Sequence, residues 1–310
     1  MIKPGWCTTV QDLGRPGGQR YGISVSGAMD RLALVIANRL VNNDDSAAGL
    51  EITIVGPEFL FEHDAVLAIT GADLSPAING NSVPLWTTVA IPAGGRLTFG
   101  RRRSGARSYL AVAGGFDVPL LWGSRSTHLS TKTGGHDGRA LVADDGLHVL
   151  PAVSGRERPL LGAALARASR PIYADSPTLR VLAGPHHVSP EALSILTATA
   201  YRVTSQSNRM GYRLEGEPIP YVPHTRISDG VTMGALQIPP DGQLILLMAD
   251  RPTTGGYPKV AVVISADLPQ AAQLQPGDTV NFRTITLPES EAALVNQWRQ
   301  INEVLPQQTP

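Results

Sequence analysis

Short runs of β-branched and apolar residues recur along the chain, and glycine or proline separates one run from the next. Many short strands with turn signals between them favour a sandwich or a barrel over alternating strands and helices. The pattern therefore predicts a mainly β protein. Strands are expected at residues 50–55, 65–70, 96–100, 107–115, 179–184, 243–250 and 259–265.

Helical patterns are few. From Met29 to about Val41, apolar residues recur at the spacing of one buried helical stripe. We expect Ser26 to cap the free amides at the start of this helix, with Gly27 allowing a tight entry. Two more helices are expected, one after Ser189, where proline follows a capping serine, and one in PESEAALVNQWRQI near the carboxyl end.

The chain has 310 residues, enough for two domains of ordinary size. A stretch from about Pro151 to Pro177 mixes proline, arginine, alanine and serine with little strand pattern, which indicates a linker. The sequence AGGRLTF at 93–99 resembles PGDTVNF at 276–282, because in both a glycine turn leads into an alternating strand that ends in phenylalanine. These short matches are compatible with two related halves.

Composition excludes several classes of partner and of site. Lys and Arg number 26, as do Asp and Glu, so the formal net charge is zero, which argues against nucleic acid or an anionic membrane. No apolar run reaches the ~20 residues that span a bilayer, and the start MIKPGWC lacks the apolar core of a signal peptide, so a cytoplasmic protein is expected. Cys7 is the only cysteine, which excludes an intramolecular disulfide and argues against a cysteine-based zinc site.

Polar segments of the first half are most simply structural. They are TTVQDLGR at 8–15, SGAMD at 26–30 and GSRST at 123–127. The exposed amides of the helix start, or Arg125, have an alternative role in holding an anion. We expect Gln11, Asp12 and Arg15 mainly to tie the amino-terminal strand to the helix start, with partner contact as a second role.

The second half holds a denser set of functional groups. The sequence ADRPTTGGYPK at 249–259 joins two apolar strands and carries more functional groups than a hairpin turn requires. Phosphate-loop, G-x-S-x-G and H-E-x-x-H motifs do not occur. His186 and His187 follow glycine and proline and are expected in a surface loop.

The motifs and their order carry a family resemblance. GWCTTVQDLGR, SGAMD, SYLAVAGGFDVP, GSRST, SNRMGYRL, SDGVTMGALQIP and LMADRPTTGGYPK follow one another over nearly the whole chain. In this the chain resembles the carboxyltransferase-domain family, which includes allophanate hydrolase subunit 2, the C subunit of 5-oxoprolinase, the KipA-type regulators and the carboxyltransferase domain of urea carboxylase. The resemblance implies two cyclophilin-like β-barrel halves with a few short helices, which we expect at 1–160 and 161–310.

The resemblance also implies an activity and a partner. We expect a subunit of an ATP-dependent hydrolase of the 5-oxoprolinase type, acting on the C–N bond of a small lactam- or urea-like substrate with a subunit 1 type chain, which is KipI-like or the B subunit of 5-oxoprolinase. ATP is used by the complex, and its site in this chain is not predicted. The alternatives are a KipA-type regulator without catalysis, and carboxyl transfer from carboxybiotin. Any biotin must be on another chain, because the AMKM motif of a biotin carrier is absent.

Site residues are expected in the second half, beside the most apolar strands, where electrostatic groups act most strongly. Amide and hydroxyl groups match the carbonyl and N–H groups of such a substrate. The expected substrate-binding residues are Asn208, Gln237, Thr253, Thr254, Gly255 and Tyr257. The expected catalytic residues are Asp250 as a base, with Arg209 and Lys259 to hold a carboxylate or stabilise an oxyanion.

Overall fold

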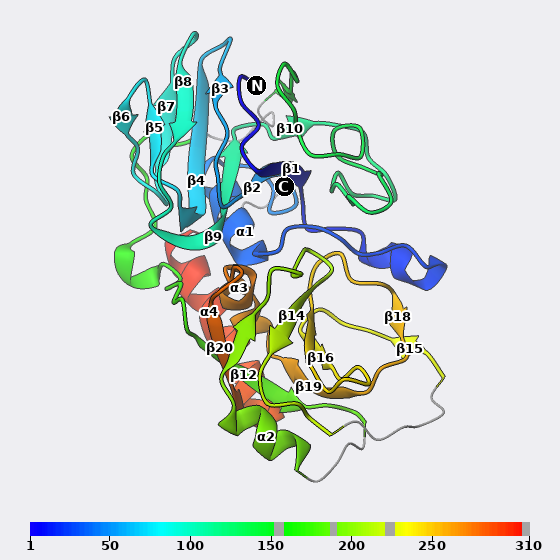
Figure 1. The fold of residues 1–310 in the computed structure, drawn as a ribbon. Helices are drawn as coiled ribbons and strands as arrows, with labels where there is room; N and C mark the ends of the chain where they lie inside the picture. The colour runs from blue at the N-terminus through cyan, green and yellow to red at the C-terminus, as the bar shows by residue number, and fades with distance from the viewer. Residues whose placement is uncertain (152–157, 187–190, 221–226, 306–310) are drawn as a thin grey trace. The chain divides into compact units, whose positions relative to one another are not determined.

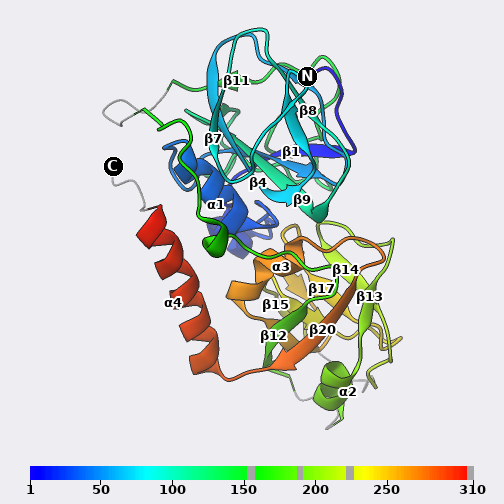
Figure 2. The ribbon, with the colours of Figure 1, turned by 90° about the vertical axis from the view of Figure 1, so that its left-hand side faces the viewer.

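The computed structural model describes residues 1–151, 158–186, 191–220 and 227–305. The chain divides into two compact units (Figures 1 and 2). Unit 1 consists of Met1–Arg15, Ser26–Ile172 and Arg299–Pro310, and unit 2 of Pro16–Val25 and Tyr173–Trp298. The expected division into two barrel halves after residue 160 stays a prediction.

Unit 1 contains two main sheets, in which neighbouring strands are antiparallel. The first has the order β1 (Cys7–Gln11), β2 (Gly49–Thr53), β9 (Ser104–Val112), β4 (Ala65–Asp73), β7 (Thr88–Ile91). The second has the order β3 (Phe59–Leu60), β8 (Arg96–Phe99), β5 (Pro76–Ile78), β6 (Asn81–Ser82). A separate pair is formed by β10 (Phe116–Asp117) and β11 (His148–Val149).

Helix α1 (Arg31–Leu40) packs on β4 and β9, the two longest strands of the first sheet (Figure 2). Both strands are mostly buried, because apolar residues point to both faces of the sheet and both faces are covered. The core beneath them includes Leu50, Ile52, Leu67, Ile69 and Leu110. The helical stripe predicted from Met29 onward is thus confirmed as a buried surface.

The start of α1 differs from the expectation. Asp30, not Ser26, is the N-cap residue, and its side chain accepts a hydrogen bond of 2.9 Å from the backbone nitrogen of Ala33. The Ser26 hydroxyl instead donates to the Thr127 carbonyl. The prediction of Ser26 as the cap was wrong because Asp30 directly precedes the first helical turn and reaches the same amides. Gly27 does allow the tight entry, with φ of +93°.

Unit 2 contains a closed barrel. Its strand order is β12 (Thr178–Ala183), β19 (Lys259–Val263), β16 (Ala235–Gln237), β17 (Ile245–Leu247), β14 (Gly211–Glu215), β13 (Tyr201–Val203), β20 (Thr279–Thr284). Closure is made by β12 and β20, which run parallel, whereas the other barrel pairs are antiparallel. Inside, Tyr201 and Phe282 contact each other with ring centroids 5.8 Å apart.

Shorter elements complete unit 2. A two-stranded ribbon is formed by β15 (Asp229–Gly230) and β18 (Thr254–Gly255) (Figure 1). Among the residues that the structure describes, the helices other than α1 are α2 (Ala192–Ala198), α3 (Leu268–Ala272) and α4 (Leu287–Val304). Short 3-10 helices are η1 (Pro16–Tyr21), η2 (Arg167–Ser169) and η3 (Ser265–Asp267).

The predicted fold class is confirmed as mainly β with a barrel and few helices. Each predicted strand region contains a strand, and the helices expected after Ser189 and near the carboxyl end correspond to α2 and α4, although Ser189 itself lies outside the described residues. Helix α3 was not predicted, because its five residues are too few to show a periodicity. In the described part of the chain, no helix combines the length and the apolar character needed to cross a membrane.

Candidate functional site

Lys259 is the centre of a charged cluster in unit 2. It is the first residue of β19 and only 5% exposed, although it carries a charge. Its Nζ donates hydrogen bonds of 2.8 Å to Oδ1 of Asp229 and 2.7 Å to the carbonyl oxygen of Gly230. Both acceptors belong to β15, so the ribbon of β15 and β18 supplies the partners that make burial of the ammonium tolerable.

His186 completes a closed chain of hydrogen bonds with Lys259 and Asp229. It follows β12, and its Nδ1 accepts a hydrogen bond of 2.9 Å from the backbone nitrogen of Lys259. A backbone N–H is only a donor, so Nδ1 carries no proton and the neutral ring bears its proton on Nε2. That nitrogen lies 3.2 Å from Oδ2 of Asp229, to which it donates. His186 therefore orients the Asp229 carboxylate from one side while Lys259 holds it from the other.

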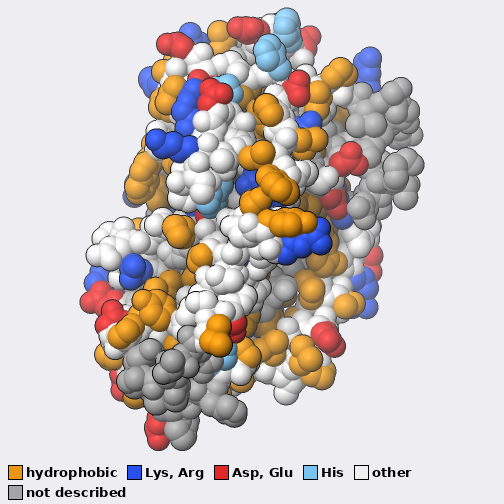
Figure 3. All heavy atoms as spheres, turned by 90° about the vertical axis from the view of Figure 1, so that its right-hand side faces the viewer, with side chains coloured by type: hydrophobic (Ala, Val, Ile, Leu, Met, Phe, Trp, Pro, Cys, Tyr) orange, Lys and Arg blue, Asp and Glu red, His pale blue; other side chains and the backbone are white. Residues whose placement is uncertain are grey.

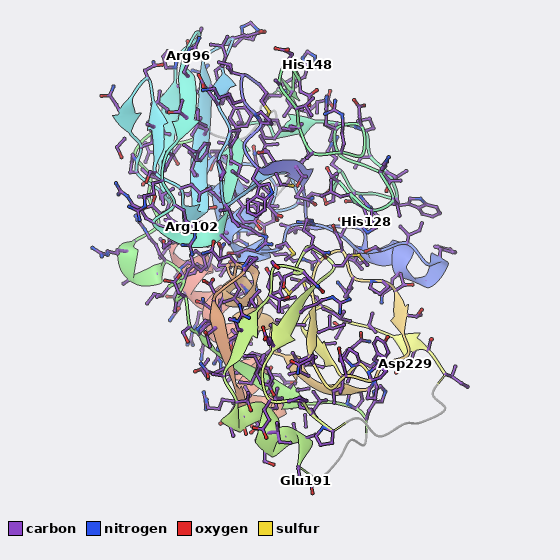
Figure 4. All side chains as sticks on the ribbon, viewed as in Figure 1. Arg96, Arg102, His128, His148, Glu191 and Asp229 are labelled. Carbon is purple, nitrogen blue, oxygen red and sulfur yellow. The ribbon has the colours of Figure 1, made fainter. Side chains whose placement is uncertain are left out.

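The environment keeps Asp229 ionised. The hydrogen bond from Lys259 lowers the pKa of this carboxyl group below its ordinary value, burial opposes the shift, and His186 adds to it. The Asp229 side chain is 46% exposed, in contrast to those of Lys259 and His186. Figure 4 labels Asp229 at the ribbon formed by β15 and β18. The cluster thus presents an accessible anionic acceptor next to a nearly buried cation.

Gln237 lies opposite Lys259 in the pairing of β16 with β19, at a bulge in the register. Its side chain is buried, and a Cβ added to Gly255 would lie 2.6 Å from its Nε2. Only glycine at position 255 lets the ribbon approach the Gln237 amide this closely. Two of the expected substrate-binding residues, Gln237 and Gly255, are therefore brought together with Lys259.

The other expected residues of this loop have mixed environments. Thr254 is exposed and pairs with Gly230 in the ribbon. The Thr253 carbonyl accepts a hydrogen bond from the Val231 backbone nitrogen. Tyr257, which lies between β18 and β19 in the sequence, is 41% exposed. Backbone pairing accounts for Thr253 and Thr254 without any ligand.

Arg209 and Asp250 form a buried ion pair of their own. Nε of Arg209 lies 2.9 Å from Oδ2 of Asp250, and Nη2 lies 3.0 Å from Oδ1, a two-pronged contact. Their side chains are 9% and 4% exposed. Asn208 is exposed, and its side-chain oxygen accepts a hydrogen bond from the Met210 backbone nitrogen, which closes the turn before β14. This geometry favours a structural role for all three.

The polar segments of unit 1 form a buried network. Asp12 accepts hydrogen bonds from the hydroxyls of Ser124 and Ser126, and Arg15 donates to the Ser126 carbonyl. Gln11 donates to the Thr127 carbonyl, and the Asp12 carbonyl accepts from the Ala28 backbone nitrogen. As expected, these side-chain and backbone contacts connect the first strand, the helix start and the segment 123–127.

A second buried contact in unit 1 joins Tyr109 to Glu51. The Tyr109 hydroxyl donates to Oε2 of Glu51 over 2.7 Å and accepts from the Asp30 backbone nitrogen over 2.8 Å. Burial, and then the carboxylates of Glu51 and Asp30, raise the pKa of Tyr109 well above its ordinary value. This phenol is therefore a neutral structural link between the sheet and α1.

Sequence reasoning missed His186. It was expected in a surface loop, and it does lie in a bend after β12, but its side chain is only 11% exposed and bonds to Asp229 instead of facing solvent. His187 lies outside the described residues. The overlooked signal is the position of His186 soon after β12, which pairs with β19. Within the described ranges, no group of three or more His, Cys, Asp or Glu side chains is arranged to hold a metal ion.

Comparison with known proteins identifies the family. The model of the carboxyltransferase domain, subdomains A and B, matches residues 21–284. The chain belongs to this family. A carboxyltransferase-domain relative, the C subunit of 5-oxoprolinase from Escherichia coli K12, is 39% identical over 309 residues, which cover 98% of this chain and 96% of the relative.

Two further proteins that match this chain are much longer than it. Urea amidolyase of Saccharomyces cerevisiae is 31% identical over 312 residues, which cover 95% of this chain and 17% of the enzyme. The crystal structure of Kluyveromyces lactis urea amidolyase superimposes with a TM-score of 0.91 at 29% identity, covering 98% of this chain. The match spans only 20% of the Kluyveromyces chain.

Proposed function

We propose that this chain is a subunit of an ATP-dependent hydrolase of the 5-oxoprolinase type. The observation that carries the proposal is the match to the C subunit of 5-oxoprolinase over 98% of this chain and 96% of the relative. The reaction adds water across the ring C–N bond of 5-oxoproline and releases glutamate, while ATP is hydrolysed to ADP and phosphate. A subunit 1 type chain is the proposed partner.

We place the substrate-binding site at the cluster of Lys259, Asp229 and His186. Lys259 supplies a cation that can polarise a carbonyl group, and Asp229 supplies an acceptor that can orient an N–H group. His186 is a positioning residue, because its tautomer is set by the backbone of Lys259 and its remaining N–H is directed at Asp229. The Arg209 and Asp250 pair, expected from sequence to be catalytic, is in this proposal a structural support.

The cluster does not fit ATP. One ammonium and one carboxylate leave it without net positive charge, whereas a triphosphate needs several cations or backbone N–H groups. We therefore assign no step through ATP to these residues, and propose that the nucleotide is bound elsewhere in the complex.

The partner surface is proposed to involve exposed apolar side chains. In unit 1, Leu120, Leu121 and Trp122 are consecutive and are 59%, 36% and 57% exposed. Figure 3 shows one face of the molecule, on which hydrophobic side chains lie between charged ones. Exposed apolar groups of this size often mark contact with another chain.

The test is reconstitution of this chain with the subunit 1 type partner and any other subunits of the complex. ATP-dependent release of glutamate from 5-oxoproline is then assayed. Lys259→Met should abolish most of the activity, and Lys132→Met, at an exposed lysine of unit 1, serves as the matched control. Release of glutamate without ATP, or none from a fully assembled complex, would contradict the proposal.

A second function is carboxyl transfer to urea, favoured by the match of 95% of this chain to urea amidolyase. The same complex is therefore assayed with urea, bicarbonate, ATP, a biotin carrier protein and a biotin carboxylase that makes carboxybiotin. Consumption of urea instead of 5-oxoproline would select this function. A complex that turns over neither substrate, yet binds its subunit 1 type partner, would instead agree with a KipA-type regulator.

A further inference from the structure

Gln237 carries a buried amide nitrogen for which the described residues provide no acceptor. The residue is 5% exposed, and its Nε2 makes no hydrogen bond within the described ranges of the chain. An unsatisfied buried N–H group costs about 1–3 kcal/mol, so most proteins avoid one. Its presence in the charged cluster indicates a donor kept for a ligand.

Lys259 provides a second donor beside it. The two residues are directly opposite each other on β16 and β19, so their side chains leave the sheet on the same face, with Cβ atoms about 5 Å apart. An ammonium group has three N–H bonds. Asp229 and Gly230 take two of them, and the third has no acceptor among the described residues.

The ribbon of β15 and β18 covers both donors. Gly255 of β18 lies against Nε2 of Gln237, while Asp229 and Gly230 of β15 hold Nζ of Lys259. Each strand of the ribbon has two residues, and three of the four are exposed. Displacement of β18 at Gly255 therefore gives a ligand access to the Gln237 amide, while the hydrogen bonds to Lys259 keep β15 in place.

The charge of the cluster selects the kind of ligand. Lys259 and Asp229 compensate each other, and His186 is neutral, so the net charge is zero. A carboxylate ligand would lie close to the Asp229 carboxylate and be repelled by it. A neutral planar amide suits the cluster better, because in a lactam or a urea the carbonyl oxygen and an N–H group lie on one edge. The oxygen needs donors and the N–H needs an acceptor, and this cluster has both.

We propose that Gln237 is a specificity-determining residue, whose Nε2 joins the third Nζ proton of Lys259 in binding the carbonyl oxygen of a neutral cis-amide, while Asp229 accepts the amide N–H. The inference rests on the proposed function only in the class of substrate. It goes beyond that function by adding the Gln237 amide as a second donor to the carbonyl oxygen.

The test is binding of small lactams to the full chain, followed by NMR of the side-chain amides. The probes are 2-pyrrolidinone, N-methyl-2-pyrrolidinone, which lacks the N–H, and cyclopentanecarboxylate, which replaces the amide by an anion. We expect 2-pyrrolidinone to shift the Gln237 amide signals and N-methyl-2-pyrrolidinone to bind about tenfold more weakly, equivalent to ~1.4 kcal/mol. The carboxylate should not bind.

Two variants test the residue itself. Gln237→Met should raise the Kd for 2-pyrrolidinone about tenfold, whereas Gln206→Met, at an exposed glutamine of the same unit, should leave it unchanged. If Gln237→Met does not fold, Gln237→Glu replaces it, and the comparison of the three probes needs no variant.

The inference is overturned if 2-pyrrolidinone does not bind, if it binds equally well to Gln237→Met, or if the carboxylate binds as tightly. The first result would mean that a buried water satisfies Nε2 instead. Turnover is not needed for this test. Intact lactam binding in a complex that releases no glutamate would count only against the proposed function, and turnover without a Gln237 effect only against this inference.

Discussion

The first prediction tests whether the buried pair of Arg209 and Asp250 is structural or catalytic. In Asp250→Ala the guanidinium stays about nine-tenths buried but loses two charge-assisted hydrogen bonds of 2.9 and 3.0 Å. Each such bond contributes about 1.5–3 kcal/mol, and removal of one partner of a buried ion pair costs about 3–5 kcal/mol. We therefore expect the free energy of unfolding to fall by ~3–5 kcal/mol.

Urea-induced unfolding followed by circular dichroism measures this loss. The matched control is Glu215→Ala, which breaks the pair with Arg202 in the same unit, where both side chains are more than half exposed. An exposed pair contributes only about 0–1 kcal/mol, so the control should change little. The double variant Arg209→Met, Asp250→Leu should recover part of the loss, because it leaves no buried charge unpaired.

One result would refute this reasoning. If Asp250→Ala unfolds at the same urea concentration as Glu215→Ala while turnover of the assembled complex falls about 100-fold, the carboxylate acts in catalysis. Asp250 would then be the base expected from the sequence, and the structural role of the pair would be wrong.

Three further predictions concern other groups. Arg15→Ala should lower the free energy of unfolding by ~1 kcal/mol or somewhat more and leave turnover per assembled complex unchanged; lost turnover in a well-assembled complex would move the chemistry to unit 1. The lowered pKa of Asp229 means that its contribution to stability is present above the unfolded value of ~3.9 and is lost as the pH falls through the folded value. A carboxyl NMR titration at or above ~3.9 would contradict this. Burial raises the pKa of Tyr109, so its contribution is present below the unfolded value of ~10 and is lost as the pH rises through the folded value; ultraviolet absorbance should show it ionising only as the protein unfolds.

Local pattern was enough to predict most of the fold. The apolar runs that form β4 and β9 are separated by turn residues, and the apolar residues of α1 recur at helical spacing. Both patterns involve residues close in sequence, so these elements could be predicted. The order of long motifs was likewise sufficient to indicate the family. Local pattern failed where two residues offered the same chemistry, since Ser26 and Asp30 both can cap a helix and only the folded chain places Asp30 at the first turn.

The site depended on tertiary structure. Lys259 and Gln237 could be selected from sequence, because a charge and an amide beside apolar strands are conspicuous. Their partners could not, since Asp229 is 30 residues and His186 73 residues from Lys259 along the chain. These groups meet because β12 and β16 both pair with β19 and the ribbon lies over its first residue. Strand pairing joins distant segments by backbone hydrogen bonds, which almost any residue can make. The side chains of a sequence therefore say little about which segments will pair.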